Sequence, residues 1–244
     1  MAISIFRGIG SAIGVPAQAL PKPKSASKFR DIAYCGTFRS DGKLLAAGDA
    51  TGKVTVFEAA TAALLRELTG HKDATRVVAW AADNMHLLSG SDDCSLRYWD
   101  LPTQKSVLVQ KGAHADFVRA AAQSPASDET WLTGGYDRKV RLWDVRVPGA
   151  GEDGDRRCNA LMEMDHGSPV EATLFLPGGG IALSAGGDVI KVWDVLAGGR
   201  ELHSLSHHSR AITSLVLDGT RTRLVSGGLD GHVRWSARGL GAGC

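Results

Sequence analysis

A short motif recurs five times along the chain, and its spacing restricts the folds that are possible. The clearest copy is LTGGYDRKVRLWD at Leu132–Asp144, typical of a strand, a tight turn at Asp137 and a second strand. From Val140 to Trp143 the side chains alternate between two faces, as in a strand with two different environments. Related copies span residues 45–58, 88–100, 183–194 and 225–236.

The copies end at aromatic residues that are spaced almost evenly. The separations between Phe57, Trp99, Trp143, Trp193 and Trp235 are 42, 44, 50 and 42 residues. A period of about 40–45 residues, with histidine near the start of each unit and Trp-Asp near its end, is typical of WD-repeat β-propellers. We therefore predict an all-β fold, a WD-repeat β-propeller with five blades visible of an expected seven.

The resemblance to WD repeats implies a hydrogen-bonded tetrad of His, Ser or Thr, Asp and Trp in a blade. Such groups satisfy one another's hydrogen bonds, which makes their burial tolerable. In the fourth and fifth copies the interval from Asp to Trp is five residues rather than six, and we expect an imperfect tetrad in the fourth. The matching positions are His71, Ser89, Asp93, Trp99, His114, Thr133, Asp137, Trp143, His166, Ser184, Asp188, Trp193, His208, Ser226 and Asp230.

Segments at both ends and one insertion do not fit the repeat. We predict a disordered leader at 1–28, a propeller at 29–236 and an unstructured tail at 237–244. The glycine-rich, charged stretch 147–157 is expected to be a solvated loop between blades three and four. An open propeller has unpaired strand edges, which favour aggregation. We therefore interpret the chain as an incomplete product of a longer gene, and the alternative is that partners cover its edges. The expected blades are about 29–58, 64–100, 107–144, 161–194 and 202–235.

Composition narrows the class of protein. The balance of 28 basic and 26 acidic residues gives a net charge of +2, which neither demands nor excludes a nucleic-acid partner. Cys35, Cys94, Cys158 and Cys244 lie far apart without a Cys-x-x-Cys pair, which favours reduced thiols in an intracellular protein and disfavours zinc. No copy of the repeat is long or apolar enough to span a bilayer. The leader has no acidic residue before Asp31, so an organelle targeting peptide stays an alternative to a disordered leader or a misplaced start codon.

The histidine, hydroxyl and carboxylate residues do not indicate a catalytic site. They recur at equivalent places in several copies, whereas a nucleophile and its base would occur once. The pair His207-His208 has no second cluster at ligand spacing, so we predict no enzyme activity, no metal and no cofactor. Arg138, Lys139 and Arg141 place three cations at one turn and are candidate RNA contacts. No interleaved aromatic residues suggest base stacking, so ordinary solvated turn residues are the alternative interpretation.

Two long stretches resemble one WD-repeat family more closely than the general repeat does. These stretches, and two shorter segments that agree with them, are residues 29–48, 165–199, 89–93 and 134–138. The most specific part is SAGG at 184–187, which leads to KVWD at 191–194. Over about residues 28–234 the chain resembles the family of U-three small nucleolar RNA-associated protein fifteen, a component of the small-subunit processome.

The resemblance implies a non-enzymatic scaffold in the nucleolus. That family belongs to an early-acting subcomplex that binds the 5′ external transcribed spacer of pre-rRNA, and it supports pre-rRNA transcription and the early cleavages toward small-subunit rRNA in ribosome biogenesis. The expected partners are other processome subunits and, as part of the complex, the pre-rRNA spacer, with no membrane and no small-molecule substrate. The leader does not match and the family's C-terminal helical domain is absent, so the resemblance is to a form truncated at both ends.

A substrate receptor of a cullin-type ubiquitin ligase is the alternative function. Such receptors use the same fold, and the stretch from Trp143 to Arg146 has the form Trp-Asp-x-Arg that is associated with adaptor binding. Arg146 is therefore a candidate adaptor contact. Only one copy has this form, which also occurs by chance in this fold, so the scaffold remains the leading hypothesis.

Overall fold

The computed structural model describes residues 29, 31–146 and 158–235 of the chain. Within them, nineteen strands form five separate antiparallel sheets, and no helix is present. Strands that follow one another in the sequence are neighbours within a sheet, so each sheet is a meander of consecutive hairpins. The predicted leader at 1–28, the inserted loop at 147–157 and the tail at 237–244 lie outside the described residues.

Four of the sheets have four strands, and the fifth has three in the described part of the chain. The first sheet contains β1 Ala33–Phe38, β2 Leu44–Asp49, β3 Val54–Glu58 and β4 Leu64–Leu68. The second contains β5 Thr75–Trp80, β6 His86–Ser91, β7 Leu96–Asp100 and β8 Lys105–Gln110. The third contains β9 Val118–Gln123, β10 Thr130–Gly135, β11 Lys139–Asp144 and β12 Ala160–Asp165. The fourth contains β13 Val170–Phe175, β14 Ile181–Gly186, β15 Val189–Asp194 and β16 Arg200–Leu205, and the fifth β17 Ile212–Leu217, β18 Leu224–Gly228 and β19 Val233–Trp235.

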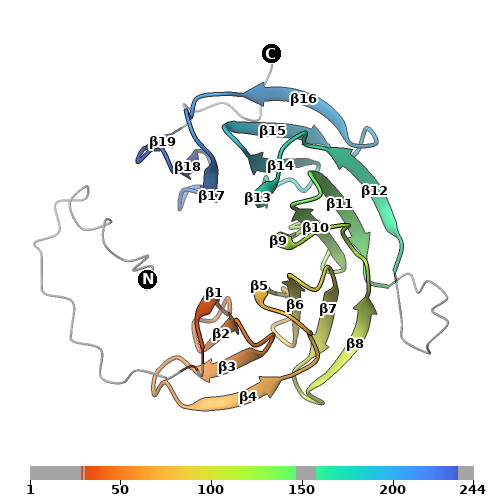
Figure 1. Ribbon diagram of the computed structural model, residues 1–244, viewed down its shortest axis with the longest axis vertical. Helices are drawn as coiled ribbons and strands as arrows, with labels where there is room; N and C mark the ends of the chain where they lie inside the picture. The colour runs from red at the N-terminus through yellow and green to blue at the C-terminus, as the bar shows by residue number, and fades with distance from the viewer. Residues whose placement is uncertain (1–28, 30, 147–157, 236–244) are drawn as a thin grey trace, which may run out of the picture.

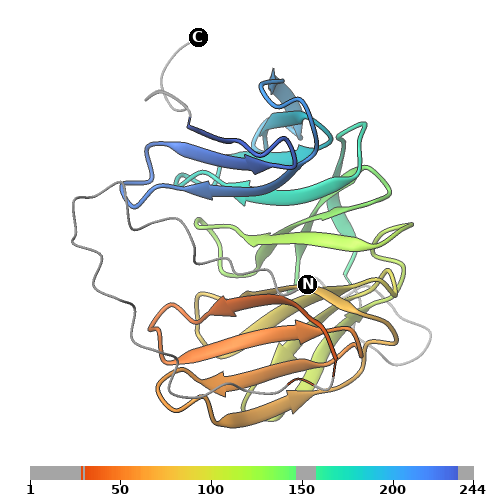
Figure 2. The same ribbon diagram turned by 60° about the vertical axis from the view of Figure 1, so that its left-hand side comes forward.

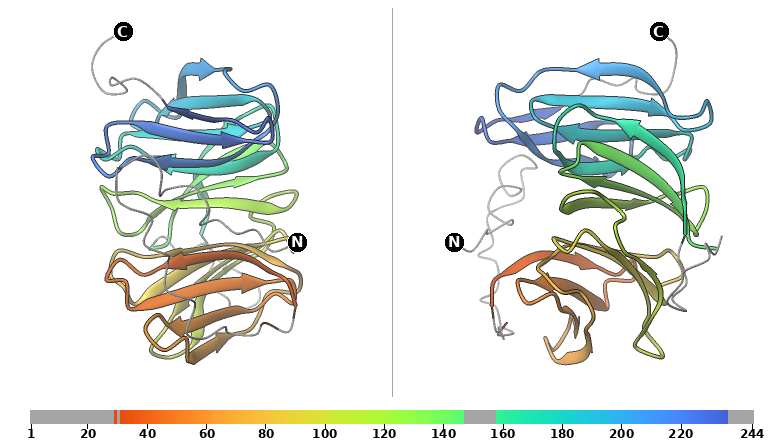
Figure 3. Two further views of the ribbon diagram at one scale, coloured as in Figure 1. Left: turned by 90° about the vertical axis from the view of Figure 1, so that its left-hand side faces the viewer. Right: turned by 45° about the vertical axis from the view of Figure 1, so that its right-hand side comes forward.

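The five sheets stand around a common centre as the blades of a propeller. In Figure 1 the first strands β1, β5, β9, β13 and β17 lie innermost, while β4, β8, β12 and β16 run along the outside. Each innermost strand contacts the innermost strand of the next sheet. As far as the described residues go, the ring is open between the first and the fifth sheet, and Figures 2 and 3 show these two sheets on either side of the opening. The all-β propeller predicted from the repeat is confirmed.

The first sheet begins at the expected place but includes one more strand, and each later sheet begins one strand later than the blade that we expected from the sequence. The stretch Leu64–Leu68 opens the expected blade 64–100, yet β4 pairs with β3 and completes the first sheet. Consecutive strands joined by short turns stay paired, and the chain crosses to the next innermost strand only after the outer strand ends. For the same reason the insertion 147–157 falls between β11 and β12 of the third sheet, and not between blades three and four.

The hydrophobic core consists of four layers, each between two neighbouring sheets. Between the first and second sheets, Leu68 packs with Leu87 and Trp99. Between the second and third sheets, Tyr98 and Trp131 meet edge to face with ring centroids 6.0 Å apart. The two later layers are likewise built from both neighbours. Since each fully buried large side chain contributes about 1.5–3 kcal/mol, contacts between sheets supply much of the stability.

Glycines in the second strand of a sheet allow the next sheet to approach closely. A Cβ atom on Gly90 would lie 2.6 Å from Cγ1 of Val118, the first residue of β9. A Cβ atom on Gly134 would collide with Val170, the first residue of β13. Because Val118 and Val170 are fully buried, each of these glycines forms a socket that receives a β-branched side chain of the next sheet.

Apolar side chains are exposed on the two sheets that flank the opening. On the fifth sheet, Val233 and Trp235 are 62% and 64% exposed. On the first sheet Phe38 is 54% exposed, as is Ile32 directly before β1. In the described part of the chain no further sheet covers these faces. Uncovered apolar faces and strand edges of this kind favour association with another element or another protein.

Replacing Gly134 tests the close packing of neighbouring sheets. Gly134→Ala should lower the free energy of unfolding by about 1–3 kcal/mol, because the added methyl group collides with Val170 and forces the third and fourth sheets apart. Urea denaturation measures this change. Gly178→Ala is the matched control, since no atom lies within 4 Å of its added Cβ, and its stability should stay the same or rise by up to about 1 kcal/mol. Equal stability of the two variants would contradict the socket arrangement.

Candidate functional site

Buried polar side chains form hydrogen-bonded sets in four of the five sheets, and the second sheet shows the complete arrangement. The Trp99 indole N–H donates to Oγ of Ser89 over 2.8 Å, and this oxygen lies 2.7 Å from Nε2 of His71. Nδ1 of His71 lies 3.1 Å from the carboxylate of Asp93. Because the carboxylate of Asp93 can only accept, the proton of the neutral histidine is on Nδ1, and Nε2 accepts from the hydroxyl of Ser89.

The third sheet repeats this chain of bonds with threonine as the hydroxyl. His114 lies 2.8 Å from Thr133 through Nε2 and 2.9 Å from Asp137 through Nδ1, and the Trp143 indole donates to Thr133 over 2.8 Å. Arg141 adds an ion pair to Asp137 at 2.7 Å. The imidazole of His114 and the hydroxyl of Thr133 are buried, so each must find its partners within the set.

The turn aspartates hold the loops of a sheet together. Burial alone would raise the pKa of Asp93, but hydrogen bonds from His71, Ser95 and the backbone N–H of Lys72 outweigh it and hold that pKa well below its usual range. Lys72 lies in the crossing between sheets and Ser95 in the turn between β6 and β7. The carboxylate of Asp93 therefore links the β4–β5 connection to the β6–β7 turn. Asp137 does the same in the third sheet, and its pKa is lowered for corresponding reasons.

The fourth sheet departs from the predicted tetrad. The Trp193 indole donates to Ser184 over 2.8 Å as expected, but His166 approaches Ser184 through Nδ1, also at 2.8 Å. Its Nε2 donates to the carbonyl oxygen of Gly186 over 3.1 Å. Asp188 is exposed and makes no hydrogen bond to His166, so its assignment to the tetrad was wrong. The turn between β14 and β15 contains only two residues, which is too short to bring the carboxylate of Asp188 back to the imidazole of His166.

The fifth sheet keeps three members of the tetrad and lacks the tryptophan. His208 lies 2.9 Å from Ser226 and 3.0 Å from Asp230. In the other sheets the tryptophan stands two residues after the residue paired with the hydroxyl. Here Arg234 pairs with Ser226, so that place falls on residue 236, outside the described residues. Trp235 instead stands where Tyr98 stands in the second sheet and is exposed, although the sequence suggested that it closes the repeat.

The first sheet has an apolar version of the same arrangement. Ala47 occupies the register position of the hydroxyl, and Phe57 occupies that of the indole. The ring of Phe57 packs edge to face on Phe29, with centroids 5.5 Å apart. The hydroxyl and the indole N–H are missing together, so no buried polar group is left without a hydrogen-bond partner at these two places.

Two of the three cations proposed as RNA contacts already have carboxylate partners. Lys139 lies 3.1 Å from Asp165, and Arg141 lies 2.8 Å from Glu163 in addition to its bond with Asp137. Arg138 is exposed at the turn, with a positive φ of 69°. The turn therefore offers one cation to a phosphate where the sequence suggested three, so RNA contact by Lys139 and Arg141 stays a proposal that would require breaking ion pairs.

The candidate adaptor residue is also held within the chain. Arg146 donates from Nε and from a terminal nitrogen to the two carboxylate oxygens of Asp144, at 3.1 and 2.7 Å. Its side chain is 63% exposed, and Glu129 lies 3.8 Å away. Asp144 and Arg146 form a local bidentate ion pair after β11, and an adaptor would have to compete with Asp144 for the guanidinium.

The described residues contain no group of three or more His, Cys, Asp or Glu side chains arranged to hold a metal ion. They also contain no helix able to cross a membrane. Cys35, Cys94 and Cys158 are free thiols. Burial raises the pKa of Cys35 to about 12 and that of Cys158 to about 11, which keeps both in the unreactive thiol form at neutral pH.

Two features were missed in the sequence. The first is the carbonyl oxygen of Gly186 as the partner of His166, although the five-residue interval from Asp188 to Trp193 was a signal for it. The second is a groove beside Arg66, lined by residues of the first and second sheets. Its residues come from separate segments, and no local pattern reveals it.

Comparison with known proteins agrees with this geometry. The profile of the "WD domain, G-beta repeat" family matches residues 62–100, 105–144 and 199–235. The crystal structure of the β-propeller domain of Cps50 (Swd1) from Myceliophteria thermophila superimposes with a TM-score of 0.74 at 19% identity, covering 86% of this chain and 67% of that one. The chain is a WD-repeat β-propeller protein.

The WD-repeat chain is also similar to a narrower set of proteins. It is 41% identical over 211 residues to the "U3 small nucleolar RNA-associated protein 15 homolog" of Xenopus tropicalis, which covers 86% of this chain and 39% of the relative. The U3 small nucleolar RNA-associated protein 15 of Schizosaccharomyces pombe is 40% identical, and the match covers 86% of this chain and 41% of the relative. The protein of the same name from Saccharomyces cerevisiae is 32% identical, and the match covers 86% of this chain and 40% of the relative. The chain thus spans about two fifths of the length of the curated relatives it matches. The predicted resemblance to this family is confirmed.

The hydroxyl at position 133 can be tested by an isosteric change. Thr133→Val should lower the free energy of unfolding by about 2–4 kcal/mol, because it leaves the buried ring nitrogen of His114 and the indole of Trp143 without their shared partner. Thr133→Ser keeps the hydroxyl and loses one methyl group, so it should cost only about 0.5–1.5 kcal/mol. Chemical denaturation compares the two variants, and a valine variant as stable as the serine variant would refute the tetrad's structural role.

Acid should weaken the fourth sheet through its histidine. Burial lowers the pKa of His166 below the ordinary value of 6.5 more than its bond to Gly186 raises it. The unfolded chain therefore binds a proton at this residue before the folded chain does, and stability falls as the pH drops below about 6.5. His166→Gln should make the loss of unfolding free energy between pH 7.5 and 5.5 smaller than in the unchanged chain. An identical pH dependence of the two proteins would contradict this account.

Proposed function

We propose that this chain is a non-enzymatic scaffold of the small-subunit processome that acts in the nucleolus. It would support pre-rRNA transcription and the early processing steps toward small-subunit rRNA. The observation that carries the proposal is the similarity over 86% of the chain to proteins whose names associate them with the U3 small nucleolar RNA. Because the chain spans only about two fifths of the length of those relatives, the similarity does not by itself assign the activity of the complete relatives to this chain.

The polar geometry supports a scaffold and not an enzyme. A histidine bonded to a hydroxyl recurs in four sheets, and its second nitrogen faces an aspartate in three of them and the Gly186 carbonyl oxygen in the fourth. A nucleophile needs an accessible oxygen beside its base, whereas Ser89, Thr133 and Ser184 are fully buried and bonded to an indole. The sets therefore serve to hold loops in place.

The proposed partners are other processome subunits, with the pre-rRNA 5′ external transcribed spacer reached as part of the complex. Rigid sheets position loops around the ring, and the apolar faces at the opening provide surface for protein contacts. The ligase alternative is not favoured, because the guanidinium of Arg146 is already bound by Asp144.

Purification of the tagged chain from its own cells tests the proposed function. Processome subunits and pre-rRNA spacer should come with it, and Arg146→Ala should retain both, since the side chain of Arg146 pairs, among the described residues, only with the nearby Asp144 and Glu129. Mass spectrometry and RNA sequencing identify the bound components. Cullin adaptors without RNA, lost on Arg146→Ala, would replace the scaffold by the ligase. Chaperones alone would also contradict the proposal, because the chain would then join no assembly.

A further inference from the structure

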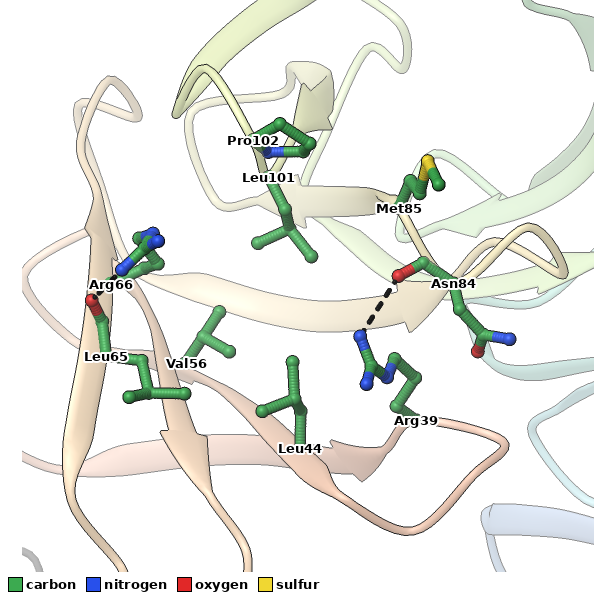
Figure 4. A pocket seen from close by; sticks show the side chains of 9 residues that line it. All are labelled: Arg39, Leu44, Val56, Leu65, Arg66, Asn84, Met85, Leu101 and Pro102. Carbon is green, nitrogen blue, oxygen red and sulfur yellow. Dashed lines mark hydrogen bonds between the residues drawn. The ribbon is translucent and has the colours of Figure 1, made fainter.

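A groove of about 330 Å³ lies between the first and second sheets. It is located at the strand ends opposite to those that carry the histidine sets, beside the β1–β2, β5–β6 and β7–β8 turns. Figure 4 shows Arg66 on one side of the groove and Arg39 with Asn84 on the other. The groove is thus formed by two repeats and does not involve the tetrads.

The space between the two arginines is lined by apolar side chains. Leu44, Val56 and Leu101 line its inner part, and Leu65 and Met85 stand at its margin. Leu65 is 40% exposed and Met85 is 59% exposed, which is high for large apolar residues on a folded domain. A partner that covers this surface with an aliphatic side chain gains the burial energy of both groups.

The two arginines differ in what already binds them. Arg39 donates to both carboxylate oxygens of Asp41, at 2.9 and 2.7 Å, and to the carbonyl oxygen of Asn84 at 3.3 Å. Arg66 donates over 2.8 Å to the carbonyl oxygen of Leu65, and no carboxylate in the described part of the chain forms an ion pair with it. Arg66 is exposed, so most of its guanidinium donors face solvent.

The groove also carries no compensating acid. None of the described residues that line it is an aspartate or a glutamate. The carboxylates next in sequence to lining residues are engaged elsewhere, since Glu67 pairs with Lys53, Asp83 bonds to His86 and Asp100 bonds to Thr103. An apolar floor beside an unpaired guanidinium is therefore complementary to a ligand with both an aliphatic group and a carboxylate.

We propose that this groove binds an acidic peptide segment of a partner protein, with an aliphatic side chain on the Leu44–Leu101 floor and a carboxylate on Arg66. The guanidinium presents parallel N–H groups that match the two oxygens of one carboxylate. A nucleic-acid backbone fits the groove less well, because affinity for phosphates requires several free cations and Arg66 alone is unpaired here. The proposal does not depend on which assembly the chain joins.

Fluorescence anisotropy with the intact chain tests the groove. The probe is a short labelled peptide with a central leucine flanked by glutamates and aspartates. Arg66→Glu should weaken its binding by roughly tenfold or more, since the change replaces attraction of the carboxylate by repulsion. Met85→Ser should weaken it by roughly threefold or more through loss of apolar contact. Both residues are exposed, so the variants should fold, and thermal unfolding checks this.

Matched controls separate the groove from general charge attraction. Arg210→Glu makes the same charge change at an exposed loop residue between β16 and β17, and it should leave the affinity within about twofold. A probe with asparagine in place of leucine should bind more weakly, as should a probe with glutamine in place of the acids. No measurable binding by the unchanged chain would overturn the proposal, as would equal losses for Arg66→Glu and Arg210→Glu.

Discussion

Packing between neighbouring sheets is the interaction on which the rest of this structure depends. A single four-stranded meander has two faces to bury, and here each layer of the core is shared by two sheets. Trp99 faces the first sheet, while Tyr98 on the same strand faces the third. The glycine sockets bring the innermost strands close enough for this packing. A repeat of about the same length therefore builds a ring, because every sheet presents the next one with the same surface.

The buried tetrads solve a second problem, which is how to connect the loops at one end of the sheets without leaving polar groups unsatisfied. Their variation shows which part is essential. In the fourth sheet a backbone carbonyl replaces the aspartate, and the ring of His166 turns so that both nitrogens keep a partner. In the first sheet Ala47 and Phe57 remove the hydroxyl and the indole together. It matters more that every buried polar group of a set has a hydrogen-bond partner than which residues form the set.

Much of the fold could be predicted from the sequence, because period and turn residues are local properties. The tetrads of the second and third sheets followed from the resemblance of these segments to WD repeats. The one-strand offset of the second to fifth sheets was missed, since pairing of β4 with β3 depends on topology and not on composition. The place of Trp235 was misjudged because its motif looks complete, although Trp235 directly follows Arg234, the residue paired with Ser226, and so comes one residue too early for the tetrad. Ion pairing of Lys139 and Arg141 joins β11 to β12 across the insertion, which no local pattern reveals.

The central claim is that stability resides in the layers between sheets, so a sheet with two neighbours is held more firmly than a sheet with one. Hydrogen exchange of the backbone amides, followed by mass spectrometry, measures this directly. The account predicts the slowest exchange in β6, β10 and β14, which belong to sheets packed on both sides, and faster exchange in β18 and β2 of the sheets at the opening. Equal protection in all five sheets would contradict the claim, because their stability would then not depend on the neighbouring sheet.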